Sequence, residues 1–251
     1  MAQPRATGTS IIRALRVVEA VAAAGDGVTP KAIARRLGIP LPSVYRVIGT
    51  LVEEGYLVRL QEVRGYGLGH RVVQLHRSLA EQVRPSAPVR EVLHDVHTTA
   101  GAAAYLVVLR AADIVVAHVD DCAEHPRPGP MRVGEPVAPH ATAAGKAVLA
   151  DLRPGPLAAF VARRRGSRDA VLPAVDAPEL HRIHRRGTAV EVSEYQPGTA
   201  GVAAAVHAPG GAVRGALGVS VSCADLDARG PELERVVREA ARRATDCAAP
   251  G

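Results

Sequence analysis

The sequence predicts two domains: a small, mainly helical N-terminal domain and a larger α+β domain with a mainly antiparallel sheet. The chain has 251 residues, which exceeds the usual size of one domain. Apolar residues follow a helical period over residues 10–54, whereas strand and helix patterns are mixed in the rest of the chain. Charge is uneven as well. Residues 1–84 carry 12 Arg and Lys against 6 Asp and Glu, net +6, while residues 85–251 carry 19 of each sign, net zero.

The N-terminal domain begins with three expected helices. They span residues 10–24, 30–37 and 42–54. The second helix has Thr29 as a good N-cap and Pro30 as a good first residue, and Gly38 stops it. Pro42 cannot lie inside a helix but suits the first turn of the third one.

A short hairpin follows these helices. Strands at 56–59 and 66–68 flank a turn at 62–65. Three helices followed by a hairpin indicate a winged helix-turn-helix. A linker helix then runs to about residue 83, where prolines mark a boundary. The expected domains are therefore 8–69, the linker 70–85, and 86–251.

The second domain shows a different order of elements. Helices are expected at 87–98, 141–151, 156–164, 177–187 and 230–247. Strands are expected at 102–109, 114–119, 188–193, 201–207 and 213–221. Residues 121–136 are expected to form a long loop, and Pro209-Gly210-Gly211 turns the last two strands into a hairpin. This mixture indicates an α+β fold with a mainly antiparallel sheet.

The third helix has one apolar and one polar face. Val44, Val47, Ile48 and Leu51 fall at i, i+3, i+4 and i+7. In a helix-turn-helix the second helix of the pair lies in the DNA major groove, so the opposite face is expected to meet DNA. The candidate DNA contacts, including two on the hairpin, are Thr29, Pro42, Ser43, Tyr45, Arg46, Thr50, Arg64 and Tyr66. The alternative is that Tyr45 and Arg46 form only the solvated face of an amphipathic helix.

Composition excludes several other classes of protein. The three cysteines, Cys122, Cys223 and Cys247, fit neither a disulfide framework nor a zinc finger. The first ten residues lack the apolar run of a signal peptide, and no stretch of about 18 apolar residues appears. We therefore expect a soluble cytoplasmic protein with no membrane partner and no cofactor.

Three patterns resemble chemical sites but fit them poorly. Gly145-Lys146 would need Gly at position 140 and Ser or Thr at 147 to form a phosphate loop. Residues 218–222 lack the closing glycine of a nucleophile elbow. His94 and His97 lie three apart on a helix and could share a metal with His118 or Asp120, but ten histidines in the chain produce such pairs by chance.

Several runs together resemble one family. The runs SIIRALRVVEAVAAAGDGVTPKAIARRLGIPLPSVYRVIGTLVEEGYLVR and YGLGHRVVQL are similar to the DNA-binding domain of the IclR (isocitrate lyase regulator) family. The runs MRVGEPVAPHATAAGKAVLA, RRGTAVEVSEYQPGTAGVAAAV and GALGVSVS resemble its ligand domain, in the same order. The resemblance implies a GAF-like effector domain, a dimer or tetramer, and DNA binding controlled by a small molecule.

The resemblance also implies an effector pocket. Its residues, carried over by position, are Ala143, Ala144, Glu191, Gly201, Ser220 and Ser222. The family has a cysteine where Gly201 stands, and a proline where Ala205 stands. Loss of the cysteine side chain is expected to enlarge the pocket, which favours an effector larger than a two- or three-carbon keto acid.

Taken together, the sequence predicts a ligand-responsive, sequence-specific transcriptional regulator of the repressor type, which is not an enzyme. It would bind double-stranded operator DNA as a homodimer or homotetramer. The alternative is a small-molecule enzyme domain with an accessory basic domain, but no pair of nucleophile and base supports turnover.

Overall fold

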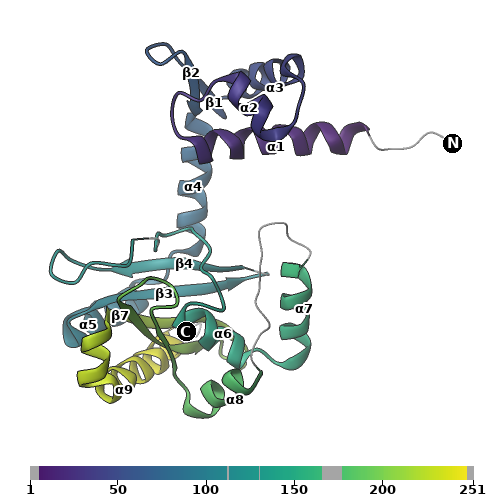
Figure 1. Ribbon diagram of the computed structural model, residues 1–251. Coiled ribbons are helices and arrows are strands. Elements are labelled where there is room, and N and C mark those ends of the chain that lie inside the picture. The colour runs from purple at the N-terminus through teal and green to yellow at the C-terminus, as the bar shows by residue number, and fades with distance from the viewer. Residues whose placement is uncertain (1–5, 112, 130, 166–176, 248–251) are drawn as a thin grey trace. The chain divides into compact units, whose positions relative to one another are not determined.

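The computed structural model describes residues 6–111, 113–129, 131–165 and 177–247 (Figure 1). The chain divides between Leu79 and Ala80 into two compact units, each of which is described by itself. Among the described helices, none combines the length and the apolar character that a membrane span requires.

The N-terminal unit consists of three helices, a two-stranded sheet and most of a fourth helix. Their bounds are α1 Ala6–Ala24, α2 Pro30–Leu37, α3 Leu41–Glu53, β1 Leu57–Leu60, β2 Gly65–Leu68 and α4 His70–Val83. One apolar core joins the first three helices to β1, and its fully buried members include Val17, Ile33, Val44 and Ile48. The predicted winged helix-turn-helix is confirmed, with each predicted boundary except that of α1 within two residues.

The turn between α2 and α3 follows from its sequence. The Thr29 Oγ1 accepts a hydrogen bond from the Ala32 N–H at 3.3 Å and caps α2. Gly38 ends the helix at a φ of +65°, a conformation that glycine adopts without the steric cost of a side chain, and its N–H donates to the Ala34 carbonyl. Pro40 then holds an extended conformation, and α3 begins at the next residue.

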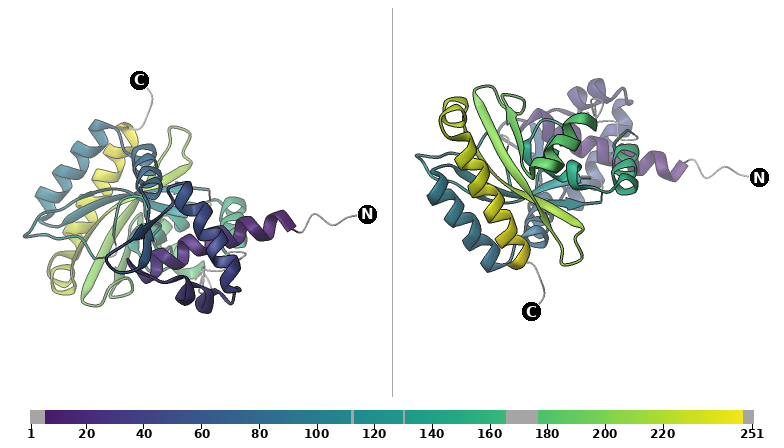
Figure 2. Two further views of the ribbon diagram at one scale, coloured as in Figure 1. Left: turned by 90° about the horizontal axis from the view of Figure 1, so that it is seen from above. Right: turned by 90° about the horizontal axis from the view of Figure 1, so that it is seen from below.

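The C-terminal unit contains one antiparallel sheet of five strands in the order β4-β3-β7-β6-β5. The strands are β3 Ala103–Arg110, β4 Asp113–Asp120, β5 Ala189–Val192, β6 Thr199–His207 and β7 Val213–Ser222. The helices are α5 Ala87–Ala100, α6 Ala143–Asp151, α7 Pro154–Arg165, α8 Ala177–Arg186 and α9 Cys223–Cys247. Helices α5 and α9 lie together on one side of the sheet, and α6 lies against β5, β6 and β7 on the other (Figure 2).

The last helix differs from its prediction. We expected it to begin at residue 230, but helical structure already starts at Cys223. Arg229 interrupts it with φ −140° and ψ 25°, directly before Gly230 and Pro231. Proline is tolerated in the first turn of a helix, so the predicted helix corresponds to the segment after this kink. Its apolar face, with Leu233 and Val237, is fully buried.

Candidate functional site

The exposed face of α3 carries the polar residues that the sequence assigns to DNA contact. Tyr45, Arg46 and Thr50 are exposed, whereas Val44 and Ile48 on the opposite face are buried. Tyr45 is 55% exposed, which is unusual for a large aromatic side chain. A helix that exposes a guanidinium and a phenol beside one another offers donors for phosphates and for base edges.

The other predicted DNA contacts differ in how exposed they are. Thr29, Pro42 and Arg64 are exposed, and Arg64 lies in the hairpin turn with a φ of +48°. Ser43 is only half-exposed. Tyr66 is half-buried and packs against the apolar core, so its ring has a structural role whatever its hydroxyl contacts.

Gly49 lies on the same exposed face of α3. A Cβ atom built there meets no described atom within 4 Å. Among the described residues, none packs against this position of α3.

In the C-terminal unit, four of the six predicted effector residues come together on the α6 side of the sheet. Glu191 pairs with Gly201 across β5 and β6, and Gly201 pairs with Ser220 across β6 and β7. Paired residues of an antiparallel sheet share one face. A Cβ atom on Gly201 would lie 3.2 Å from the Ala143 Cβ, which places the start of α6 over this row.

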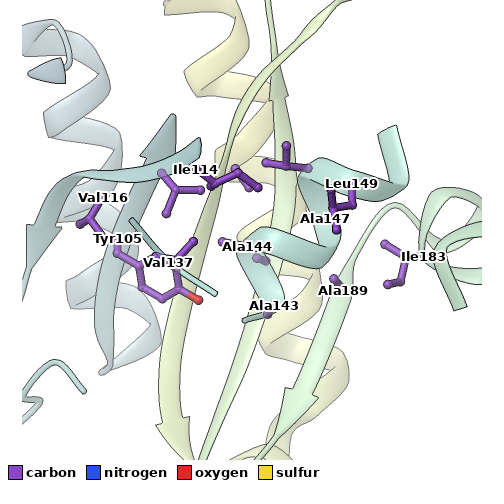
Figure 3. Packing of buried hydrophobic residues seen from close by; sticks show 14 of the residues in the cluster. Tyr105, Ile114, Val116, Val137, Ala143, Ala144, Ala147, Leu149, Ile183 and Ala189 are labelled. Carbon is purple, nitrogen blue, oxygen red and sulfur yellow. The ribbon is translucent and has the colours of Figure 1, made fainter. Parts of the chain in front are cut away.

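Ala144 lies next to this group, in the buried first turn of α6, together with Ala143 (Figure 3). That turn is built by Thr142, whose Oγ1 accepts from the Gly145 N–H at 3.1 Å. Small side chains at this helix start keep its backbone close to the sheet.

Glu191 is the charged group of the site. It is 5% exposed, and its Oε2 accepts hydrogen bonds from the N–H groups of Glu194 at 3.1 Å and Tyr195 at 3.4 Å. Burial raises the pKa of Glu191 above its ordinary 4.5, and the neighbouring Glu194 carboxylate adds to the rise, although both backbone bonds and Lys146 oppose it.

Tyr105 on β3 belongs to this site and was missed from the sequence. Its ring is 2% exposed and extends toward the start of α6 (Figure 3). Its hydroxyl lies over Gly218, 3.0 Å from a Cβ atom built there. Burial first, and then the Glu191 carboxylate, raise its pKa far above 10. Within the described chain no hydrogen bond reaches this hydroxyl. Only the strand register, which aligns Tyr105 with Gly218, would have indicated its place.

Lys146 forms ion pairs next to Glu191. Its Nζ donates to Glu179 on α8 at 2.8 Å and to Glu194 at 2.7 Å. Burial would lower its pKa, but these two carboxylates outweigh that effect and raise it. Lys146 forms these two salt bridges although it is buried at 5% exposure.

Two observations bear on the expected effector pocket. The missing side chain at Gly201 does not leave an open space, because Glu191 and Ala143 already approach within 3.1 and 3.2 Å of where its Cβ would lie. The inference of a larger effector therefore loses its basis. Ser222 is exposed, and its Oγ donates a hydrogen bond to Asp225 Oδ2 at 2.7 Å. The Ser222 hydroxyl therefore contacts the first turn of α9.

The pKa of Glu191 predicts a pH dependence of stability. As pH rises through about 4.5, the unfolded chain releases this proton before the folded chain does, so the folded state loses stability in the window just above 4.5. Glu191→Gln removes this loss. We expect the stability of the variant, measured in urea titrations, to increase relative to that of wild type as the pH rises above 4.5. A difference independent of pH, or the same gain in the exposed control Glu232→Gln, would contradict this assignment.

The start of α6 predicts a second result. A Cβ atom at Gly145 would lie 2.5 Å from both the Cα and the carbonyl oxygen of Pro139, which are backbone atoms and cannot yield without moving the chain. We expect Gly145→Ala to destabilise the C-terminal unit by about 1–3 kcal/mol. Gly155→Ala on α7, where no described atom lies within 4 Å, is the control and should be neutral or slightly stabilising. Equal urea midpoints for the two variants would rule out this packing.

The histidine pair considered for a metal is engaged otherwise. His97 is buried and its Nδ1 lies 2.7 Å from the Ala102 carbonyl, while the His94 Nδ1 lies 3.2 Å from Asp120 Oδ2. Among the described residues, no group of three or more His, Cys, Asp or Glu side chains is arranged to hold a metal ion.

Comparison with known families gives two matches in chain order. Residues 10–61 match the family model of the IclR helix-turn-helix domain. Residues 82–245 match the model of the C-terminal domain of the bacterial transcriptional regulator IclR.

Individual proteins agree with these matches. The chain is 30% identical to the HTH-type transcriptional regulator BhcR of Paracoccus denitrificans, over 95% of this chain and 86% of that one. It is 23% identical to the acetate operon repressor of Salmonella typhimurium, over 94% of this chain and 88% of the repressor. An IclR homolog from Microbacterium hydrocarbonoxydans, solved with 4-hydroxybenzoate, has the same fold, with a TM-score of 0.69, 21% identity, and coverage of 95% of this chain and 98% of its own.

Proposed function

The chain belongs to the IclR family of bacterial transcriptional regulators, and we propose that it represses transcription by binding an operator through α3 until a small molecule binds at the α6 side of its sheet. Both matched domains are those of regulators and not of enzymes, so the enzyme alternative is set aside. Relatives named as repressors, such as the acetate operon repressor, support the direction of control.

The observation that carries the DNA-binding proposal is the division of α3. Its buried face holds the core together, which leaves Tyr45, Arg46 and Thr50 exposed without a packing role. The surplus of positive charge lies in residues 1–84 and supports contact with a polyanion. Arg46 is proposed to bond a guanine edge, and the exposed Arg64 on the hairpin is proposed to meet the minor groove or a phosphate.

We further propose a homodimer that joins N-terminal units. Helix α1 exposes Ile11, Ile12 and Leu15 at 53–59%, and α4 exposes Val73 and Leu75 at 51% and 58%. Large aliphatic side chains exposed to this extent support an interaction surface, with Ile11, Ile12 and Leu15 close together in the sequence of α1. A dimer would place two α3 helices on a pseudo-palindromic site.

The dimer proposal gives a direct prediction. Leu15→Glu puts a charge into the apolar surface of α1, so we expect sedimentation analysis to show monomers at concentrations where wild type is dimeric. Val63→Glu is the matched control, because Val63 is 57% exposed in the hairpin turn, and it should leave the dimer intact. A dimer that tolerates Leu15→Glu as well as Val63→Glu would place the interface elsewhere.

The effector is proposed to bind among Tyr105, Ala143, Ala144, Glu191 and Ser220. The buried Tyr105 hydroxyl and Glu191 carboxyl supply hydrogen-bonding groups in an otherwise apolar setting, which is typical of small-molecule sites. The effector can release DNA only if it binds one arrangement of the dimer more tightly than the other.

Footprinting on DNA upstream of the gene tests the proposed function. We expect protection of two half-sites separated by one helical turn or a multiple of it. An added effector should remove the protection in wild type but not in a Tyr105→Phe variant. Uniform protection along the DNA, without half-sites, would contradict specific recognition.

A further inference from the structure

The C-terminal unit also contains a groove beside the last turn of α4. It has a volume of about 830 Å³ and lies between the last turn of α4, the start of α5, the adjoining ends of β3 and β7, and the end of α9. None of the effector-site residues Tyr105, Ala143, Glu191 and Ser220 lines this groove. Small-molecule sites commonly enclose about 300–1,000 Å³.

The floor of the groove is aliphatic. Val83, Val89, Leu106 and Val206 are buried at its base, and Val108 is only half-buried where it faces this space. The lining residues include no aromatic side chain, so no ring is available to stack on a flat ligand. Such a floor suits a flexible aliphatic chain.

The rim of the groove is positively charged. Three exposed arginines line it, Arg84, Arg110 and Arg214, and its lining includes no Asp or Glu. Arg110 donates to the neutral Gln82 Oε1 at 3.1 Å. In the described part of the chain, neither Arg84 nor Arg214 has a side-chain hydrogen bond or an ion pair.

Some other arginines of this unit are neutralised by acidic partners. Arg127 pairs with Asp121 at 2.8 Å and Arg243 with Asp95 at 2.7 Å. Because residues 85–251 have no net charge, Arg110 and Arg214, with Arg84 beside the same cavity, form a local excess of positive charge. A ligand carboxylate would be bound there by charge-assisted and bidentate hydrogen bonds.

We propose that this groove is a second ligand site, which takes an aliphatic monocarboxylate with a chain of medium length. The chain lies on the valine and leucine floor, and the carboxylate meets Arg110 and Arg214 at the rim. Since Gln82 and Val83 belong to the last turn of α4, the ligand also contacts the helix that leads to the N-terminal unit.

Calorimetric titration of the full chain with decanoate tests this site. We expect saturable binding of one decanoate per chain. Acetate has the charge without the chain, 1-decanol has the chain without the charge, and decylamine reverses the charge. Each should bind at least about tenfold more weakly than decanoate.

The matched variants each remove two exposed arginines. Arg110→Gln with Arg214→Gln should weaken decanoate binding at least about tenfold, whereas Arg235→Gln with Arg242→Gln on α9 should change it less than about twofold. Circular dichroism spectra of both double variants will show whether they remain folded.

Three results would overturn the proposal. Decanol could bind as tightly as decanoate, which would mean that the rim does not select for charge. The control pair could lose as much affinity as the rim pair. The rim pair could instead dissociate an oligomer while wild type binds no decanoate, which would make the groove an interface between copies of the chain.

Discussion

We expect Arg46→Ala to weaken operator binding by about tenfold to a hundredfold, a loss of about 1–3 kcal/mol. Arg46 is exposed on α3 and makes no contact that the fold requires, so the variant should unfold at the same urea concentration as wild type. The loss should be concentrated on the operator, because a base contact specifies sequence while phosphate contacts only position the protein.

Arg242→Ala is the matched control for this prediction. Arg242 is 71% exposed on α9, and its replacement removes the same charge from the other unit. Equal losses in the two variants would show that only overall charge matters. Unchanged operator affinity of Arg46→Ala would remove Arg46 from the recognition surface.

Lys146→Met is expected to have the largest effect on the C-terminal unit. It removes the cation shared by Glu179 and Glu194 and leaves two carboxylates facing a buried position. Removing one partner of a buried ion pair costs about 3–5 kcal/mol, but these carboxylates are 32% and 43% exposed, so we expect about 1.5–3 kcal/mol.

The same variant should also lose the response to effector. The N–H groups of Glu194 and Tyr195 hold the Glu191 carboxylate, and Lys146 fixes Glu194. Operator binding without effector should persist, because the residues proposed to contact DNA lie in the other unit. Arg242→Met provides the control for loss of an exposed cation. A Lys146→Met protein with the stability and effector response of Arg242→Met would contradict the supporting role of Lys146.

Local signals were sufficient to predict most of the fold. Thr29, Gly38 and Pro42 mark the helix ends of the helix-turn-helix, and the i, i+3, i+4 pattern identifies the buried face of α3. The early start of α9 was missed because its first segment lacks an apolar face. Its start depends instead on the bond between Ser222 and Asp225.

The effector residues were harder to predict, because they come from separate strands and a helix. The family resemblance suggested Glu191, Gly201 and Ser220, and the register of β5, β6 and β7 brings them into one row. The position of Tyr105 beside these residues depends on the pairing between β3 and β7, which a single sequence does not reveal. The packing of Glu191 over Gly201 likewise depends on tertiary structure that no local sequence pattern shows.

The central claim is that this chain recognises a specific operator through α3. An anisotropy titration against the DNA upstream of its own gene, with excess nonspecific competitor and at two salt concentrations, tests it most directly. We expect saturable binding that survives the competitor, weakens as salt increases, and falls by at least tenfold, on the order of 1.4 kcal/mol, in Arg46→Ala. Binding no tighter than that of competitor DNA, with the same result for every fragment in a genome-wide selection, would contradict it.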